Sequence, residues 1–186
     1  DSGPKQIMFL NIWDLMKARR KNEFAKCIEN ADFIIPISKS IIWGAKFLKK
    51  EIPIRYNPFN IIIRVLSILE ERYKSFYLLG GRSKTLVEAE KNVKKTFPHL
   101  HLVGGFPGYF PKTMEDNIVL AIYKASPTLV LVSEGIKEKD MWSYNRKDRF
   151  SSSIFLYYKE AVGIFGGRIN RVKEKTFEKG FEFLHE

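Results

Sequence analysis

Apolar and polar positions alternate along this chain with two different spacings. Short runs rich in β-branched and aromatic residues predict strands at 7–12, 33–37, 75–79, 100–103, 129–132 and 154–158. Between them, apolar residues recur every three or four positions and predict helices at 15–30, 41–49, 59–73, 84–97, 113–125 and 173–184. Strands that alternate with helices predict an α/β fold with a mostly parallel sheet and helices on both faces.

Two of these helices carry an explicit apolar stripe, which we expect to pack on the sheet. The predicted stripe of 59–73 consists of Ile61, Val65, Ile68 and Leu69. The predicted stripe of 84–97 consists of Leu86, Ala89, Val93 and Phe97. In the closing helix 173–184, the residues expected to face inward are Phe177, Phe181 and Leu184.

Glycine-bearing turns follow three of the predicted strands: Gly80-Gly81, the loop 104–111 with Gly108, and Gly135. Open parallel sheets bind ligands at the carboxyl ends of their strands. Glycine lets backbone N–H groups approach an oxyanion, which suits a phosphate or a nucleotide. The same glycines also serve tight strand-to-helix turns, and the pattern by itself favours that simpler interpretation.

Composition narrows the class of protein. The chain has 186 residues, 45% hydrophobic and 28% charged, which excludes a disordered tail, a collagen-like fibre and a disulfide-stapled miniprotein. No apolar run is long enough to span a bilayer, and no charged-then-apolar leader predicts a signal peptide. We expect one domain over 7–186, with residues 1–6 an expression remnant or a flexible N-terminus.

The charge balance points to anionic partners. Lysine and arginine number 32 against 21 aspartates and glutamates, a net charge of +11. Such a surface favours nucleic acid, anionic lipid headgroups or phosphorylated substrates and does not choose among them. The single Cys27 excludes an internal disulfide and a multi-cysteine metal site, and it favours a reducing, cytoplasmic compartment.

The middle of the chain carries a recognisable series of motifs: Phe76-Tyr77-Leu78-Leu79-Gly80-Gly81, then Phe97-Pro98-His99-Leu100, Val103-Gly104 and Gly108-Tyr109-Phe110. In this order and spacing it resembles the WecG/TagA/CpsF family of bacterial glycosyltransferases. Flanking blocks extend the resemblance to nearly the whole chain, from about residue 7 to 186: Asn11, Ala31 to Pro36, Arg55, Pro127 to Val132, Gly135, Trp142, Arg171 and Gly180.

The resemblance implies a Rossmann-like fold and a specific reaction. Family members transfer an N-acetylaminosugar, typically N-acetylmannosamine, from a UDP-sugar to a polyprenyl-diphosphate-linked acceptor in envelope polysaccharide synthesis. It further implies no metal or other cofactor, and a cytoplasmic protein that can lie at the inner membrane face. The family's C-terminal membrane appendage is expected to be absent here. A homo-oligomer is compatible with the family but cannot be deduced from the sequence.

The resemblance also places the substrate site. The residues that match family motifs and are expected to line it are Asn11, Arg55, Gly80, Gly81, Gly108, Tyr109 and Gly135, and Lys139 is expected to line it from the position of a family Gln. Tyr109 and Phe110 could stack on a uracil ring or close the core under the loop; the family match favours a site-lining role for Tyr109, and Phe110 is expected to belong to the core. Arg82 is equally consistent with a diphosphate ligand and with a solvated side chain.

Several chemistry-bearing positions depart from the family. After Pro36 the family carries Asp-Gly-x-Gly, whose Asp is the proposed catalytic base, and this chain has Ile37-Ser38-Lys39-Ser40. Isoleucine cannot accept a proton, so no catalytic residue is assigned. Lys139 replaces the family's Gln, and Gly163 replaces a later Asp. We therefore expect the family activity to be lost or altered.

Three acids near Gly135 are candidates to replace the family's catalytic base. Glu134 is the strongest because it lies at the end of a predicted strand, whereas Glu138 and Asp140 fit a solvated, charged helix start. His99 and His101 would share one face of a strand, but no third ligand has a metal-site spacing, so exposed histidines are the simpler interpretation.

The C-terminal run combines Arg168, Arg171, Lys173, Lys175 and Lys179 with interleaved phenylalanines. It resembles a membrane-surface helix, although docking of its aromatic face on the sheet is the favoured interpretation. Three hypotheses follow for the chain: a glycosyltransferase with lost or altered activity, a non-catalytic binding or scaffold protein derived from one, and a nucleic-acid binder. The third is least favoured because no nucleic-acid-binding motif is present.

Overall fold

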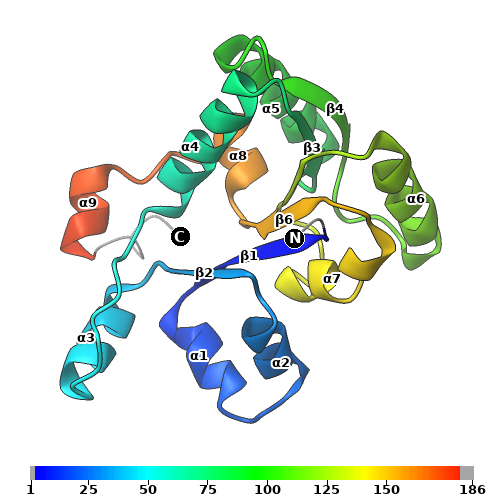
Figure 1. The fold of residues 1–186 in the computed structure, drawn as a ribbon. Coiled ribbons are helices and arrows are strands. Elements are labelled where there is room, and N and C mark those ends of the chain that lie inside the picture. Colours follow the sequence, from blue (N-terminus) through cyan, green and yellow to red (C-terminus); the bar gives the residue numbers. More distant parts are fainter. Residues whose placement is uncertain (1–2, 181–186) are drawn as a thin grey trace.

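The computed structural model describes residues 3–180, which form one six-stranded sheet in which all neighbouring strands are parallel (Figure 1). The order across the sheet is β2-β1-β6-β5-β3-β4. The strands are β1 (Lys5–Leu10), β2 (Phe33–Pro36), β3 (Ser75–Leu79), β4 (His101–Phe106), β5 (Leu129–Val132) and β6 (Ile154–Tyr157). The predicted Rossmann-like α/β class is confirmed.

Nine α-helices connect or flank these strands within residues 3–180. They are α1 (Ile12–Ala18), α2 (Glu23–Glu29), α3 (Lys39–Phe47), α4 (Pro58–Glu71), α5 (Ser83–Thr96), α6 (Glu115–Ala125), α7 (Asp140–Tyr144), α8 (Ala161–Phe165) and α9 (Glu174–Lys179). Two 3₁₀ turns, Lys112–Met114 and Lys147–Arg149, precede α6 and follow α7. Helices therefore cover both faces of the sheet (Figure 1).

Side chains of the central strand β3 show how the two faces are buried. Successive residues of a strand point to opposite faces. Phe76 and Leu78 pack with α4, α5 and α8 on one face, while Tyr77 and Leu79 pack with α6 and α7 on the other. Met8, on β1, packs with residues of α2 in a smaller third cluster. Burial on both faces explains why β5 is apolar at every position.

The predicted helix at 15–30 is two helices in the structure. The chain leaves α1 after Ala18, and Lys21 adopts a left-handed φ of 47°. Asn22 then starts α2, because its side-chain oxygen accepts a hydrogen bond from the Ala25 amide. An N-cap in the middle of an apolar pattern ended one helix and began the next, and the apolar spacing alone did not reveal it.

In α4, Leu69 of the predicted stripe is buried as predicted, but the rest of the buried face is displaced by one position. Ile61 and Val65 are half-buried and Ile68 is 43% exposed, whereas the face that packs on the sheet consists of Phe59, Ile62, Leu66 and Leu69. Every turn of this helix is rich in apolar residues, so periodicity defined the helix but not its inward direction. The stripe of α5 is confirmed, with Leu86, Ala89, Val93 and Phe97 all buried.

Strand β4 runs further than predicted. It continues through Gly104 and Gly105 to Phe106, where a loop was expected, and these residues pair with Tyr77 to Leu79 of β3. The Tyr77 ring occupies the space beside Gly104, where a Cβ would lie 2.6 Å from Cε2. The glycine is thus required inside a strand, because an aromatic side chain crosses it.

Smaller differences occur at both ends of the chain. Strand β1 begins at Lys5 rather than at 7, since the Gln6 side chain is buried and donates to the Asp140 carbonyl at 3.0 Å. The closing helix α9 ends at Lys179, where Gly180 takes a left-handed φ of 79°. Phe177 is buried as predicted, and Phe181 and Leu184 lie outside the described residues.

Cys27 gives a direct test of this packing. It lies fully buried on α2 against Gln6 and Met8, and burial raises the pKa of its thiol to about 11. We expect the native protein to resist alkylation by iodoacetamide at pH 8 and to react fully in denaturant, because the thiolate is the nucleophile. Mass spectrometry of labelled protein measures this, and fast labelling without denaturant would contradict the packing of α2.

Candidate functional site

A cleft of about 310 Å³ opens at the carboxyl ends of β1 and β6. These two strands are neighbours in the sheet, yet β1 leads on to β2 on one side while β6 follows β5 on the other. Loops that leave adjacent strands in opposite directions create a crevice, which is where open α/β sheets bind ligands. The cleft is closed on one side by the segment 164–172 and by Phe177 of α9.

One wall of the cleft is polar and held by a capping box at the start of α1. The Asn11 side chain accepts a hydrogen bond from the Asp14 amide at 3.0 Å, and the Asp14 carboxylate accepts one from the Asn11 amide at 3.0 Å. Both side chains line the cleft. Burial raises the pKa of Asp14, because desolvation outweighs its hydrogen bond to Asn11.

Asp140 faces this wall from the first residue of α7. It lines the cleft, and its Oδ1 atom is buried without a hydrogen-bond partner within residues 3–180. Burial raises the pKa of this carboxyl to about 7, and the nearby negative charge of Asp14 adds to the effect. The neighbouring cations Lys139 and Lys17 lower the pKa of Asp140, but by less than burial raises it. The cleft therefore holds a carboxyl group that titrates near neutral pH.

Ile37, at the position where the family resemblance places the base, also lines the cleft. Its amide donates to the Leu10 carbonyl at 3.0 Å, and its side chain packs against the core cluster on one face of the sheet. Ser38, at a position where the resemblance places a loop glycine, precedes α3 at its N-cap position, and its hydroxyl accepts a hydrogen bond from the Ile12 amide at 3.1 Å rather than from an amide of α3. This loop therefore presents the apolar Ile37 side chain to the cleft. The Ser38 hydroxyl is bound to the Ile12 amide within the protein.

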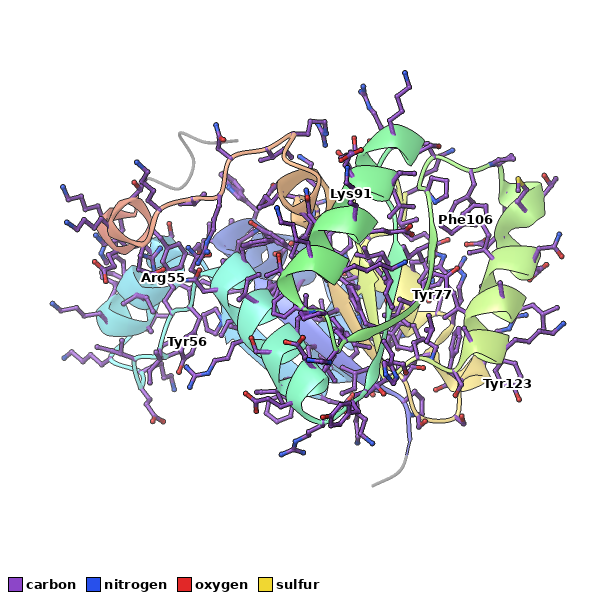
Figure 2. The ribbon with its side chains drawn as sticks, turned by 90° about the horizontal axis from the view of Figure 1, so that it is seen from above. Arg55, Tyr56, Tyr77, Lys91, Phe106 and Tyr123 are labelled. Carbon is purple, nitrogen blue, oxygen red and sulfur yellow. The ribbon has the colours of Figure 1, made fainter. Side chains whose placement is uncertain are left out.

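Arg55 lies next to the loop that carries Ile37. Its guanidinium stacks over the Phe177 ring at 3.9 Å from the centroid, and it donates to the carbonyls of Phe177 and Ile37. Figure 2 shows Arg55 and Tyr56 together beside α3, at the end of the molecule away from Tyr77 and Phe106. Arg55 thus joins α9 to the loop after β2, next to the cleft.

The predicted glycines gather elsewhere, at the carboxyl ends of β3 and β5. Gly81 donates to the Glu134 carbonyl and Gly108 to the Gly81 carbonyl, both at 2.8 Å, and Tyr109 donates to the Gly135 carbonyl at 3.0 Å. A Cβ on Gly108 would lie 2.5 Å from the Glu134 carbonyl oxygen. These close contacts between backbones explain why the turns contain glycine. Their part in ligand binding stays a prediction.

The predicted site residues therefore divide into two places. Asn11 and Lys139 line the cleft together with Ile37, and Arg55 lies beside it. Gly80, Gly81, Gly108 and Tyr109 form the glycine turns, where Tyr109 is 60% exposed. Gly135 belongs to these turns and also lines a second cavity of about 250 Å³ between Phe110 and Trp142.

The three acids proposed as replacement bases differ in their surroundings. Glu134 forms an ion pair with Arg168, and Glu138 forms one with Arg146 at 2.9 Å, which lowers the pKa of the Glu138 carboxyl. Of the three, Asp140 is the one that lines the cleft. The sequence analysis missed Asp14, although the Asn-x-x-Asp spacing of a capping box after a strand could have revealed it.

Metal binding and membrane insertion depend on the histidines and on the helices. His99 and His101 are both exposed, and the described residues contain no group of three or more His, Cys, Asp or Glu side chains placed to hold a metal ion. Across residues 3–180, no helix combines the length and apolarity needed to cross a membrane.

Comparison with known proteins gives one family. Residues 1–186, the whole chain, match the model of the glycosyl transferase WecG/TagA/CpsF family. Among curated proteins, none matches this chain.

The buried carboxyl gives a prediction with a definite sign. Asp140 keeps its proton up to about pH 7 in the folded state and loses it near pH 4 when unfolded, so its burial lowers stability progressively as pH rises from 4 to 7. Asp140→Asn should stabilise the protein by about 2 kcal/mol more at pH 8 than at pH 5. Thermal unfolding at both pH values measures the difference, with the exposed Asp116→Asn as control. Equal effects at the two pH values would contradict a buried, neutral carboxyl.

The glycine turns give a second prediction. Gly80 has a φ of 123°, and a Cβ there would lie 2.8 Å from the Glu134 carbonyl oxygen. Gly80→Ala should therefore destabilise the protein by about 2 kcal/mol or more. Gly44, inside α3 with nothing within 4 Å, is the control, because Gly44→Ala should gain about 0.5–1 kcal/mol. Urea unfolding of both variants tests the contrast, and a neutral Gly80→Ala would show that the turns tolerate a side chain.

Proposed function

Because the chain belongs to the WecG/TagA/CpsF glycosyl transferase family, we propose that its cleft binds a UDP-linked N-acetylaminosugar and that its transfer reaction is lost or altered. The acceptor proposed from the family is a polyprenyl-diphosphate-linked sugar of the cell-envelope polysaccharides. The observation that carries the proposal is the cleft at the ends of β1 and β6, which combines a polar wall with the Ile37 side chain, at the position where the resemblance places the family base.

Donor binding is supported by the chemistry of the cleft. Asn11 is fixed at the carboxyl end of β1 by its capping box, and Lys139 adds a cation at the same opening. A diphosphate needs a positive charge and hydrogen-bond donors, and a sugar needs donors and acceptors held in place. Phe9, Tyr157 and Tyr158 contribute the apolar and aromatic surface that a nucleoside and a sugar ring also require.

Altered transfer is supported by the groups that can take a proton. In the family reaction the acceptor oxygen bonds to the anomeric carbon, UDP leaves, and the acceptor hydroxyl gives up its proton. Loss of the base at position 37 is expected to lower that rate by about 10²–10⁴-fold. Asp140 lines the same cleft and is partly deprotonated at neutral pH, so it is the carboxylate that residual transfer would use.

A non-catalytic binding or scaffold protein is the second candidate. The observation that favours it is the apolar character of the loop around position 37, where Ile37 packs on the core and the Ser38 hydroxyl accepts a hydrogen bond from the Ile12 amide. In that case the cleft would bind a nucleotide sugar or another anionic ligand without turnover.

Calorimetric titration with UDP and with UDP-N-acetylaminosugars is the first test. We expect binding in the micromolar range to the purified chain. No heat of binding up to millimolar ligand would overturn donor binding and would leave the scaffold candidate.

Two matched variants locate the nucleotide. Lys139→Ala should weaken UDP binding by about tenfold if the nucleotide lies in the cleft, because one cation beside the diphosphate is lost. Tyr109→Ala should leave the affinity unchanged. The opposite result would place the nucleotide at the glycine turns.

A further pair of variants tests the proton acceptor. Ile37→Asp should raise UDP-sugar turnover by about 10²-fold or more, since it returns a carboxylate to the family position. Asp140→Asn should abolish any turnover that the unmodified chain retains and leave UDP affinity unchanged. Binding without turnover in both the unmodified chain and Ile37→Asp would support the non-catalytic candidate.

A further inference from the structure

Helix α3 and the segment after it expose an unusual number of large apolar side chains. Their exposed fractions are 62% for Trp43, 86% for Phe47, 66% for Leu48, 53% for Ile52 and 68% for Ile54. We call these five residues the α3 surface. No residue of α3 is fully buried, although the helix is mostly apolar. A helix whose large apolar side chains face outward over a continuous stretch indicates an interaction site.

Helix α1 extends this exposed region. Its Trp13 is 77% exposed and Met16 is 49% exposed, and α1 likewise has no fully buried residue. The starts of the two helices are in contact, because the Ile12 amide of α1 donates to the hydroxyl of Ser38, the residue that directly precedes α3. Figure 1 shows α1 and α3 projecting on the same side of the sheet, away from α5 and α6.

The charges around the α3 surface are almost all positive. Lys46, Lys49 and Lys50 are exposed among the apolar residues, and within residues 3–180 none of them forms an ion pair. Glu51 is the one acid between residues 39 and 56. On the neighbouring helix, Lys17 is also exposed, and three basic residues follow α1 at 19–21.

We propose that the α3 surface is a docking site for an anionic lipid bilayer. Aromatic and aliphatic side chains bury in the headgroup region, tryptophan in particular lies at the interface, and interleaved lysines bind anionic headgroups. A second copy of this chain would bring two sets of lysines together and would be repelled. Nucleic acid would pair with the lysines but would leave Phe47 and Leu48 exposed to water.

This docking site is separate from the cleft. None of the five residues of the α3 surface lines the cleft, although Arg55, which directly follows the surface, donates to the carbonyls of the lining residues Ile37 and Phe177. Lipid binding can therefore be measured without any knowledge of the nucleotide or sugar that the cleft accepts.

The chain's three tryptophans provide the measurement. Trp13 and Trp43 are exposed on this side of the molecule, whereas Trp142 is 1% exposed. Vesicles of phosphatidylcholine with about 30% phosphatidylglycerol should shift the tryptophan emission to the blue and sediment the protein. Pure phosphatidylcholine vesicles should bind it at least about tenfold more weakly, and the difference should shrink as salt increases.

Matched variants assign the effect to this surface. Phe47→Ser with Leu48→Ser should reduce vesicle binding by about tenfold or more, while Val87→Ser with Leu120→Ser, exposed on α5 and α6, should not. All of these sites are exposed, so the variants are expected to fold, and circular dichroism verifies it.

A second set changes charge by the same amount at two places. Lys46, Lys49 and Lys50 replaced by Gln should weaken binding by about 10²-fold, since each basic residue near an anionic surface contributes about fivefold. Lys84, Lys94 and Lys95, exposed on α5, replaced by Gln should weaken it far less. Equal losses in the two triple variants would indicate attraction by net charge alone and overturn the proposal.

Two further outcomes would also overturn it. One is no binding to anionic vesicles. The other is a concentration-dependent dimer, detected by light scattering, that Phe47→Ser with Leu48→Ser dissociates, because that result would assign the α3 surface to a second copy of the chain.

Discussion

A parallel sheet has to bury both of its faces, and this requirement shapes nearly everything else in the chain. The apolar side chains of β3 and β5 alternate between the two faces, so helices are needed above and below. Each helix must then return the chain to the amino edge of the sheet, which leaves all loops after the strands at one edge. The cleft and the glycine turns both lie at that edge, and the chemistry available to the protein is concentrated there.

The two places at this edge are built in different ways. The glycine turns are closed by backbone hydrogen bonds among the loops after β3, β4 and β5, and there is little room for another atom beside Gly108. The cleft is left open because the chain leaves β1 and β6 in opposite directions. Asp140 then sits in the cleft with a buried oxygen that has no hydrogen-bond partner among residues 3–180, which is a cost to stability that a functional site tolerates more readily than a structural one.

The same fold leaves one region apolar and exposed. Burial on the sheet uses α4, α5 and α8 on one face and α2, α6 and α7 on the other, so α3 projects beyond the strands with its tryptophan and phenylalanine in solvent. Surrounding lysines keep such a surface soluble and give it a preference for anionic partners. The exposed apolar surface does not depend on the chemistry of the cleft, because none of its five residues lines the cleft.

The sequence by itself determined the class of fold, five strands to within two residues, the burial of Leu86, Ala89 and Val93, and the family. These follow from local periodicity and from motifs, which are written along the chain. Only the tertiary structure decided which apolar side of α4 faces the sheet, that Gly104 lies inside a strand, and that Asp14 and Asp140 share one cleft although they are far apart in sequence. Inward direction, strand extension and the pKa of a buried carboxyl depend on neighbours brought in by distant segments, so no local pattern can specify them.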